Sequence, residues 1–342
     1  MKYIGCDAHI TTCSFHVVDE KGISLDSRTM VTNGTLLIDY LRGIHGEKKL
    51  VIEETNLSRW LYSILSREVT EMVVSNPLHN RLLEEGSKND RSDSLKLAQL
   101  LRGGFIAPVF HQGDSREDLR DLVSGYVDLI GDFVRLKNRY KALFRSAGLN
   151  KTGALVYSDE SFLKELDKGP KQFVAQHVYE RISTLEAQRI KYVQEMEKQA
   201  RKYPEIKLLK TIPGIGIIHA CKIVSMLVTP DRFENKYKFF SYCGLVSHRR
   251  ESAGKYYGQK SAQGNRILKG VFRMAGWTAL RGTSSLRRSY DRMLTRGISD
   301  KNAYNAVCRK IAALVLAVWR KKEKYDDHYA EGLKRRAKTN QP

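Results

Sequence analysis

The stretch KYIGCDAHITTCSFHVVDEKGISLDSRTMV, residues 2–31, decides the fold of the N-terminal part of this chain. It contains three runs of β-branched, aromatic or alternating residues, at Lys2–Asp7, Thr12–Val18 and Ser24–Val31. Between the last two, Asp19–Gly22 has the composition of a hairpin turn. The stretch therefore predicts three antiparallel strands.

Alternating helix and strand signals continue to about residue 104. Sequence periodicity predicts helices at Thr35–Arg42, Leu57–Arg67 and Asp90–Leu101, with strands at Lys49–Glu54 and Glu71–Ser75. Three antiparallel strands followed by two crossover units are typical of the ribonuclease-H-like fold, in which the first and fourth strands are neighbours. Residues 1–104 are therefore expected to form an α/β domain of this type.

A long helical region is predicted next. Apolar residues recur at steps of three and four in a heptad seam made of Leu119, Leu122, Tyr126, Leu129, Phe133, Leu136, Tyr140 and Leu143. A second periodic stretch, Val178–Met196, is a suitable partner, and Ser146–Pro170 between them is expected to be a loop. An intramolecular helical hairpin and a coiled coil between protomers fit this pattern equally well. Residues 115–200 are assigned to this helical coiled-coil linker or multimerisation region.

The charge of the chain is concentrated in its C-terminal part. The 342 residues have a formal net charge of +21. Residues 1–200 contain 28 basic and 28 acidic residues, whereas residues 201–342 contain 31 basic and 10 acidic ones. A solvated basic surface without a ligand would be spread over the chain, so we expect a polyanionic partner, most simply a nucleic acid, on the basic half.

The cysteines and apolar runs indicate a cellular location. Five scattered cysteines form no close pair of the kind found in zinc sites and are expected to be reduced thiols. The N-terminus has no signal-peptide pattern, and no apolar run is long enough to cross a bilayer. We therefore expect a cytoplasmic protein that makes no membrane contact.

Acidic residues stand at matching places in the predicted α/β domain. Asp7 ends the first strand, Glu53 and Glu54 end the fourth, and Asp90 and Asp93 open the helix after the fifth. Because the first and fourth strands are expected to be neighbours, four carboxylates can converge there. Hard oxygen ligands suit Mg²⁺ or Mn²⁺, which assist phosphoryl transfer.

The spacing within the helix supports this convergence. Asp90 and Asp93 share one helical face with Leu97 and Leu100, and a face with leucines must turn toward the sheet. The alternative is that the two aspartates only cap the helix and favour its dipole, with the other acids solvated. Strand spacing alone does not choose between the two glutamates, because both faces of a central strand are covered by helices.

Residues 201–325 are expected to form a basic helical domain, followed by a basic tail at 326–342. The segment TIPGIGII, residues 211–218, has the pattern of a helix-hairpin-helix. Its glycines, Gly214 and Gly216, permit close approach to a phosphate backbone, and amides at the next helix start can hold a phosphate. A tight turn between two packed helices is the alternative.

A second segment of the basic half, residues 248–269, is dense in cations, glycines and hydroxyl groups. It is expected to be a loop wrapped on a nucleic-acid backbone, with contacts from Arg249, Arg250, Lys255, Lys260, Arg266 and Lys269. Its serines and tyrosines are candidate nucleophiles, because a hydroxyl that attacks phosphorus needs cations around the developing charge.

In this combination the chain resembles the DEDD transposases of the insertion-sequence-one-ten family, the bridge-RNA-guided recombinases related to the Piv DNA invertase. The resemblance covers nearly the whole chain. It is carried by Asp7, IEETN at 52–56, KNDRSDS at 88–94, IPGIG at 212–216, YCGLV at 242–246, ESAG at 251–254 and Gly264-Asn265.

The resemblance implies a RuvC-like domain, a coiled-coil linker and a C-terminal domain with a nucleophilic serine. Register with the family selects Glu53 over Glu54 and implies that Mg²⁺ (or Mn²⁺) is bound by Asp7, Glu53, Asp90 and Asp93. Register also selects Ser252 as the residue that forms a covalent serine–DNA intermediate. Because Ala253 separates Ser252 from Gly254, Ser261 is the alternative nucleophile.

The resemblance further implies that the partners are donor and target DNA, a structured guide RNA (the bridge RNA) and other copies of the chain. The expected homo-oligomer is a dimer or tetramer with a composite site shared between protomers. Two other functions stay open: a metal-dependent, junction-resolvase-like nuclease in which water attacks, and a non-catalytic nucleic-acid-binding protein in which the acids are structural.

Overall fold

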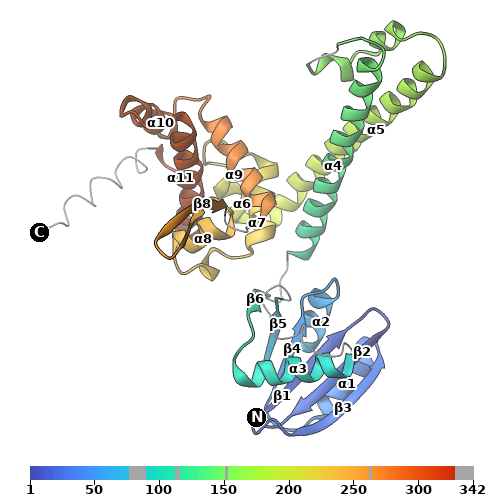
Figure 1. The fold of residues 1–342 in the computed structure, drawn as a ribbon, viewed down its shortest axis with the longest axis vertical. Helices are drawn as coiled ribbons and strands as arrows, with labels where there is room; N and C mark the ends of the chain where they lie inside the picture. Colours follow the sequence, from blue (N-terminus) through green and yellow to red (C-terminus); the bar gives the residue numbers. More distant parts are fainter. Residues whose placement is uncertain (77–89, 112–115, 151–152, 262–263, 328–342) are drawn as a thin grey trace, which may run out of the picture. The chain divides into compact units, whose positions relative to one another are not determined.

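A computed structural model describes residues 1–76, 90–111, 116–150, 153–261 and 264–327 of the chain. Within these ranges, the side chains of residues 90, 248, 249 and 259–261 lie outside the description. The chain divides into two compact units, Met1–Asp114 and Ser115–Pro342 (Figure 1). Most of the predicted basic tail, residues 328–342, lies outside the described residues.

The first unit contains a six-stranded mixed sheet with the order β3-β2-β1-β4-β5-β6. Its strands are β1 (Lys2–Ala8), β2 (Thr12–Val18), β3 (Ser24–Val31), β4 (Lys48–Glu53), β5 (Glu71–Ser75) and β6 (Pro108–Val109). The first three are antiparallel and β1 lies parallel to β4, as the sequence predicts. The edge strand β6 was not predicted, since two residues are too few to show alternation.

Helices cover both faces of this sheet (Figure 1). The helices are α1 (Gly34–Gly43), α2 (Ser58–Leu65) and α3 (Asp90–Gly103). Ile4, Cys6 and Ala8 of β1 belong to one buried apolar cluster with side chains of α1 and α2. Because side chains alternate along a strand, Gly5 and Asp7 face the other side, where α3 packs on β1 and β2.

Gly5 is the point at which α3 rests on the sheet. A Cβ atom on Gly5 would lie 2.0 Å from the Ser94 carbonyl oxygen and 2.6 Å from the Ala98 amide nitrogen. No side chain fits in that space, so the backbone of the helix contacts the backbone of the strand. This contact sets the height of the first turns of α3 above the end of β1.

The second unit begins with a helical hairpin formed by α4 (Glu117–Arg145) and α5 (Pro170–Gln199), which pack against each other. The predicted seam is buried along α4, except that Val123 and Phe144 are buried where Leu122 and Leu143 were expected. The intramolecular hairpin, one of the two alternatives, is thus present, and a coiled coil between protomers stays a prediction.

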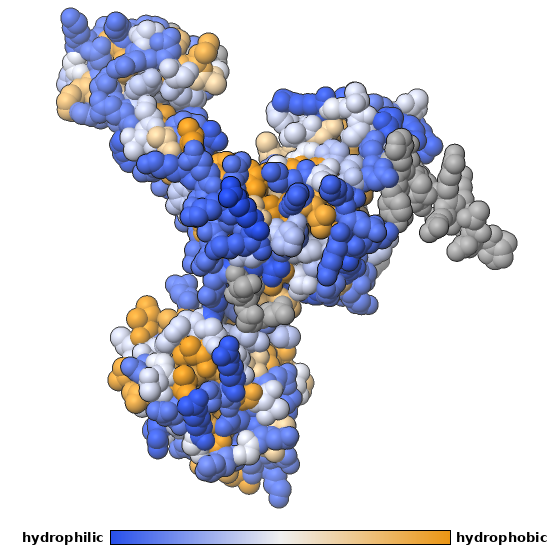
Figure 2. All heavy atoms as spheres, turned by 180° about the vertical axis from the view of Figure 1, so that it is seen from behind, coloured by the Kyte–Doolittle hydropathy of each residue, from blue (hydrophilic) through white to orange (hydrophobic). Residues whose placement is uncertain are grey.

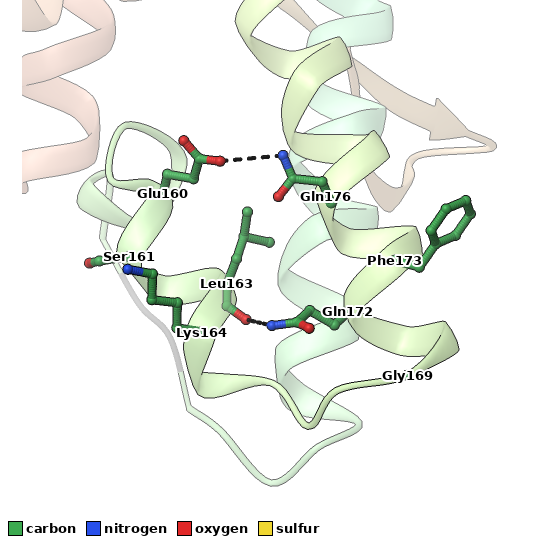
Figure 3. A pocket seen from close by; sticks show the side chains of 8 residues that line it. All are labelled: Glu160, Ser161, Leu163, Lys164, Gly169, Gln172, Phe173 and Gln176. Carbon is green, nitrogen blue, oxygen red and sulfur yellow. Dashed lines mark hydrogen bonds between the residues drawn. The ribbon is translucent and has the colours of Figure 1, made fainter.

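The tip of this hairpin folds back on α5. Two short 3₁₀ helices, η3 (Leu155–Tyr157) and η4 (Glu160–Glu165), occupy the predicted loop. Gln172 donates to the Leu163 carbonyl at 3.0 Å and Gln176 donates to Glu160 at 3.3 Å, beside a hollow of 580 Å³ (Figure 3). Hydrophobic residues are exposed among hydrophilic ones over this tip (Figure 2), and Phe173 is 65% exposed.

The rest of the second unit is a mainly helical body with one apolar core. Its elements are α6 (Pro204–Leu209), α7 (Ile217–Leu227), α8 (Lys236–Tyr242), β7 (Ser247–Ser252), β8 (Lys255–Ser261), α9 (Arg266–Ala279), α10 (Ser285–Thr295) and α11 (Asp300–Lys321). In the described ranges, no helix combines the length and the apolar character needed to span a bilayer.

The β7–β8 hairpin corrects the prediction of a loop over residues 248–269. Strands β7 and β8 pair in antiparallel fashion, and α9 begins at Arg266. The residues near the hairpin turn, 250–257, are all exposed. Because neither face of the strands is buried over these residues, they lack the alternation of apolar residues by which a half-buried strand is recognised.

We predict that Gly5→Ala lowers the free energy of unfolding by about 2 kcal/mol or more, because α3 must move to admit the methyl group. Urea denaturation of the full chain measures this. Gly43→Ala is the matched control, because a Cβ there meets nothing within 4 Å. An equal effect of both substitutions would show that the contact between Gly5 and α3 is not tight.

Candidate functional site

Carboxylates converge at the carboxyl ends of β1 and β4 beneath the first turns of α3. Cys6 pairs with Ile52, so Asp7 and Glu53 come next on neighbouring parallel strands. Burial, followed by the charges of Asp7 and Asp93, raises the pKa of Glu53. The helix α3, which carries Asp93, packs on both β1 and β4, so the three acids lie in the same part of the first unit.

These acids continue a polar row that crosses the sheet. Thr29 pairs with Ser14, and Ser14 pairs with Asp7, while Glu53 pairs with Ser75 on the other side. The hydroxyls of Ser14 and Thr29 are 2.8 Å apart. The Ser75 hydroxyl is buried and has no hydrogen-bond partner in the described part of the chain. Both serines are polar residues at buried strand positions, a signal in the sequence that did not lead to their prediction as site residues.

Two cations partly balance the acids. The His9 Nε2 atom lies 3.3 Å from Asp7 Oδ2, and the Lys96 Nζ atom lies 3.4 Å from Asp93 Oδ1. His9 carries charge only when protonated, and Lys96 is one helical turn from Asp93. Partly exposed pairs of this type are weak, so each of these two pairs contributes little to stability.

Glu54 lies apart from this cluster. Its Oε1 atom is 4.0 Å from the Nε2 atom of His111, whose ring lies 5.7 Å from the Tyr62 ring of α2. Glu53 and Glu54 therefore point to opposite faces of the sheet, and it is Glu53 that accompanies Asp7 and Asp93. Asp90 begins α3, but its side chain lies outside the described residues.

The chemistry of this cluster fits a hard divalent cation. Every converging group is a carboxylate, and the pKa of Glu53 is raised by burial and then by the charges of Asp7 and Asp93, an effect that a bound cation would offset. Among the side chains that the structure describes, however, no three acidic, histidine or cysteine groups are close enough to enclose an ion. Asp7, Glu53 and Asp93 thus supply the right donors, and closure of the site needs a further ligand or a small movement.

Ser252 stands beside the turn of the β7–β8 hairpin. It pairs with Lys255 across a two-residue turn of Ala253 and Gly254, whose φ angles of 49° and 74° are both positive. Two positive φ angles are characteristic of a type I′ turn, and this conformation costs the alanine about 1 kcal/mol. Ser252 is exposed, and the Lys255 cation lies directly across the hairpin from it.

The other residues predicted to contact nucleic acid are spread over the hairpin and α9. Arg250 and Arg266 are exposed, and Lys269 is half-buried on α9. The side chains of Arg249, Lys260 and Ser261 lie outside the described residues. The backbone of Ser261 pairs with that of Ser247, at the end of the hairpin opposite to Ser252.

The two glycines of the predicted helix-hairpin-helix differ in their surroundings. Gly214 has a φ of 87°, and a Cβ on it would lie 2.1 Å from the Ala275 carbonyl oxygen of α9. Gly214 is thus required for helix packing, as in the alternative of a tight turn between packed helices. Gly216 is exposed at the start of α7, and a Cβ there would meet nothing within 4 Å.

A backbone clamp fixes the root of the β7–β8 hairpin. A Cβ on Gly264 would lie 2.5 Å from the Gly244 amide nitrogen, and the Asn265 amide donates to the Tyr242 carbonyl at 2.7 Å. The Asn265 side chain also accepts from the Leu268 amide at 3.0 Å and caps α9. The sequence segments before and after the hairpin are therefore held together.

Two protein-family models match the chain. The DEDD transposase model of the IS110 type, described as transposase, matches residues 4–148. The model described as transposase of the IS116/IS110/IS902 family matches residues 206–291. Together they span about two thirds of the chain and include both the carboxylate cluster and the hairpin. No curated protein matches the chain significantly.

We predict that Mg²⁺ stabilises the protein through Glu53 and not through Glu54. At ten times its Kd, Mg²⁺ adds about 1.4 kcal/mol to the stability, or a rise of roughly 5 °C in melting temperature. Glu53→Gln should abolish this rise. Without metal, this variant should melt no lower than the wild type, because the repulsion of Glu53 by Asp7 and Asp93 is removed. Glu54→Gln is the matched control and should keep the full rise. Scanning calorimetry with EDTA or Mg²⁺ measures both, and an unchanged rise in Glu53→Gln would contradict the assignment.

We also predict that Gly214→Ala and Gly216→Ala have different effects. The methyl group of Gly214→Ala collides with the backbone of α9 in a left-handed conformation, so the free energy of unfolding should fall by about 2 kcal/mol or more. Gly216→Ala should change stability by less than about 1 kcal/mol, because the space there is open. Denaturant titration of the two variants checks this, and equal losses would refute the packing role of Gly214.

Proposed function

Because the chain belongs to the IS110 family of DEDD transposases, we propose that it cuts and rejoins DNA strands through a covalent serine–DNA intermediate. The first unit is proposed to be a RuvC-like domain that binds Mg²⁺ (or Mn²⁺) through Asp7, Glu53, Asp90 and Asp93. The observation that carries this proposal is that Asp7 and Glu53 stand at the ends of neighbouring parallel strands, on which α3, the helix that carries Asp93, packs.

In this proposal the first unit positions the scissile phosphate. When bound to the carboxylates, a divalent cation supplies positive charge to the phosphate oxygens on which charge develops. Lys96 and His9 hold Asp93 and Asp7, respectively, at the edge of the cluster. Gly5 keeps α3, and therefore Asp93, close to the two strand-end acids.

Ser252 is the proposed nucleophile. Its hydroxyl oxygen forms a bond to phosphorus while the bond from phosphorus to the oxygen of the adjoining nucleotide breaks. The net result is transfer of the serine proton to the leaving oxygen, which becomes a free hydroxyl. The number of phosphoester bonds is conserved, so attack by a strand-end hydroxyl on the serine ester rejoins DNA without an external energy source. Lys255, opposite Ser252 in the hairpin, places a cation near the developing charge.

The proposed partners follow from the basic half of the chain. Phosphates are proposed to be contacted by six cations, Arg249, Arg250, Lys255, Lys260, Arg266 and Lys269. The backbone amides that follow Gly216 are proposed to bind a phosphate as well. In the turn at residues 211–218, Gly216 keeps its proposed role in approaching a phosphate backbone, whereas Gly214 is needed for packing against α9. The chain is also proposed to recognise a structured guide RNA and to assemble into a dimer or tetramer. It is proposed to act in the cytoplasm.

We predict that Ser252→Ala abolishes a denaturant-resistant protein–DNA adduct while DNA binding stays nearly unchanged, because a single exposed hydroxyl is lost. Labelled DNA incubated with Mg²⁺ and separated on a denaturing gel reveals the adduct. Ser261→Ala is the matched comparison and should keep it.

The opposite pattern, with the adduct lost only in Ser261→Ala, would assign the nucleophile to Ser261. Products with free ends and no attached protein in the wild type would indicate the alternative function, a metal-dependent nuclease in which water attacks. Mass spectrometry of the adduct, which locates the modified serine, distinguishes loss of chemistry from loss of folding in either variant.

A further inference from the structure

A polar hollow of 860 Å³ lies in the second unit, between α9, α11 and the segment that leads into β7. Among the described residues that line it, four are cations, Lys269, Arg273, Lys301 and Arg309, and none is acidic. Two asparagines, Asn302 and Asn305, add amide groups. The hollow is thus lined by hydrogen-bond donors and positive charge.

The two helices hold these cations at fixed positions. Lys269 and Arg273 are one turn apart on α9, and Lys301 and Arg309 are two turns apart on α11. The Tyr304 hydroxyl of α11 donates to the Arg273 carbonyl of α9 at 2.5 Å. This bond joins the two walls, so the cations face one hollow in a body with a shared apolar core.

The described part of the chain offers these cations no carboxylate partner. Within the described residues, none of Lys269, Arg273, Lys301 and Arg309 forms an ion pair with a carboxylate. The Arg309 guanidinium donates to the Leu245 carbonyl at 3.4 Å, which ties α11 to the hairpin root. Like charges gathered in one hollow repel one another, so an anionic ligand would stabilise the arrangement.

We propose that this hollow binds the phosphodiester backbone of a nucleic-acid strand. Phosphate oxygens accept hydrogen bonds from guanidinium, ammonium and amide groups, and these are the groups that Arg273, Lys301 and Asn305 present. A small carboxylate ligand would contact only one of the cations. A nucleic-acid strand carries a phosphate at every nucleotide and can therefore contact several of them. The inference rests on the proposed function, since it adds a second contact region to the same basic unit.

The hollow lies at the base of the β7–β8 hairpin. Gly244–Ser247 form part of its lining and lead directly into β7, which ends at Ser252. The clamp between Gly264 and Gly244 fixes this root. A strand held in the hollow is therefore anchored at the base of the hairpin whose turn presents Ser252.

The test is the salt dependence of nucleic-acid binding by the full chain. Arg273→Gln combined with Lys301→Gln should reduce the slope of log K against log salt by about two, since each lost phosphate contact removes about 0.9 on B-form DNA. The loss should be alike for unrelated sequences. Fluorescence anisotropy with a DNA oligonucleotide and with an RNA of the same sequence shows which strand occupies the hollow.

The matched control is Arg292→Gln combined with Arg296→Gln, which removes the same charge from exposed positions at the end of α10. These residues do not line the hollow, so their loss should change the slope by much less. Equal losses in both pairs, or no loss in the first pair with either probe, would overturn the proposal while leaving nucleic-acid binding intact. Absence of binding by the wild type would instead contradict the proposed function itself.

A second measurement needs no variant. Acetylation of Lys301 in the wild-type chain should fall on addition of the oligonucleotide, whereas acetylation of the exposed Lys322 beyond the hollow should not. Mass spectrometry of tryptic peptides reads both sites. Unchanged or equal protection of the two lysines would overturn the proposal even if Arg273→Gln and Lys301→Gln impair folding.

Discussion

The contact between Gly5 and the backbone of α3 is the constraint on which the acidic site depends. With no side chain at Gly5, the helix approaches the strand closely enough for Asp93 to influence Glu53. The repulsion among the acids opposes this approach. Apolar packing on the same face of the sheet opposes the repulsion, because Leu97 and Ala98 of α3 and Val51 of β4 are buried. The fold thus holds together carboxylates that would separate if they were free.

Close backbone contacts also position the parts of the second unit. Gly214 rests on α9, and Gly264 rests on the Tyr242–Gly244 segment. Both contacts converge on α9, which carries Lys269 and Arg273 into the hollow and begins directly after the hairpin. The exposed β7–β8 hairpin has little apolar packing of its own. Its direction is therefore set at its root, and its turn, strained at Ala253, sets the place of Ser252 at the other end.

Sequence reasoning could predict what depends on local pattern. The strands of the first unit follow from alternation that a buried face imposes, and the acids follow from their places at strand ends and a helix start. The spacing of residues along the strand could not choose between Glu53 and Glu54, because the choice depends on which face of the sheet α3 covers; only the family resemblance favoured Glu53. The β7–β8 hairpin was missed because exposed strands carry no apolar alternation. The hollow was missed because Arg273 and Lys301 come together only when α9 packs on α11.

The distribution of charge explains why the proposed chemistry needs both units. Phosphates are repelled by a carboxylate cluster, so Asp7, Glu53 and Asp93 alone would drive a DNA strand away. A bound divalent cation offsets part of this negative charge and attracts a phosphate that lies within a few ångströms, but salt screens it from a distant strand. Long-range attraction must therefore come from the 31 basic residues of positions 201–342, four of which line the hollow. In such a division the basic unit captures the strand, and the acidic unit acts on a phosphate already held.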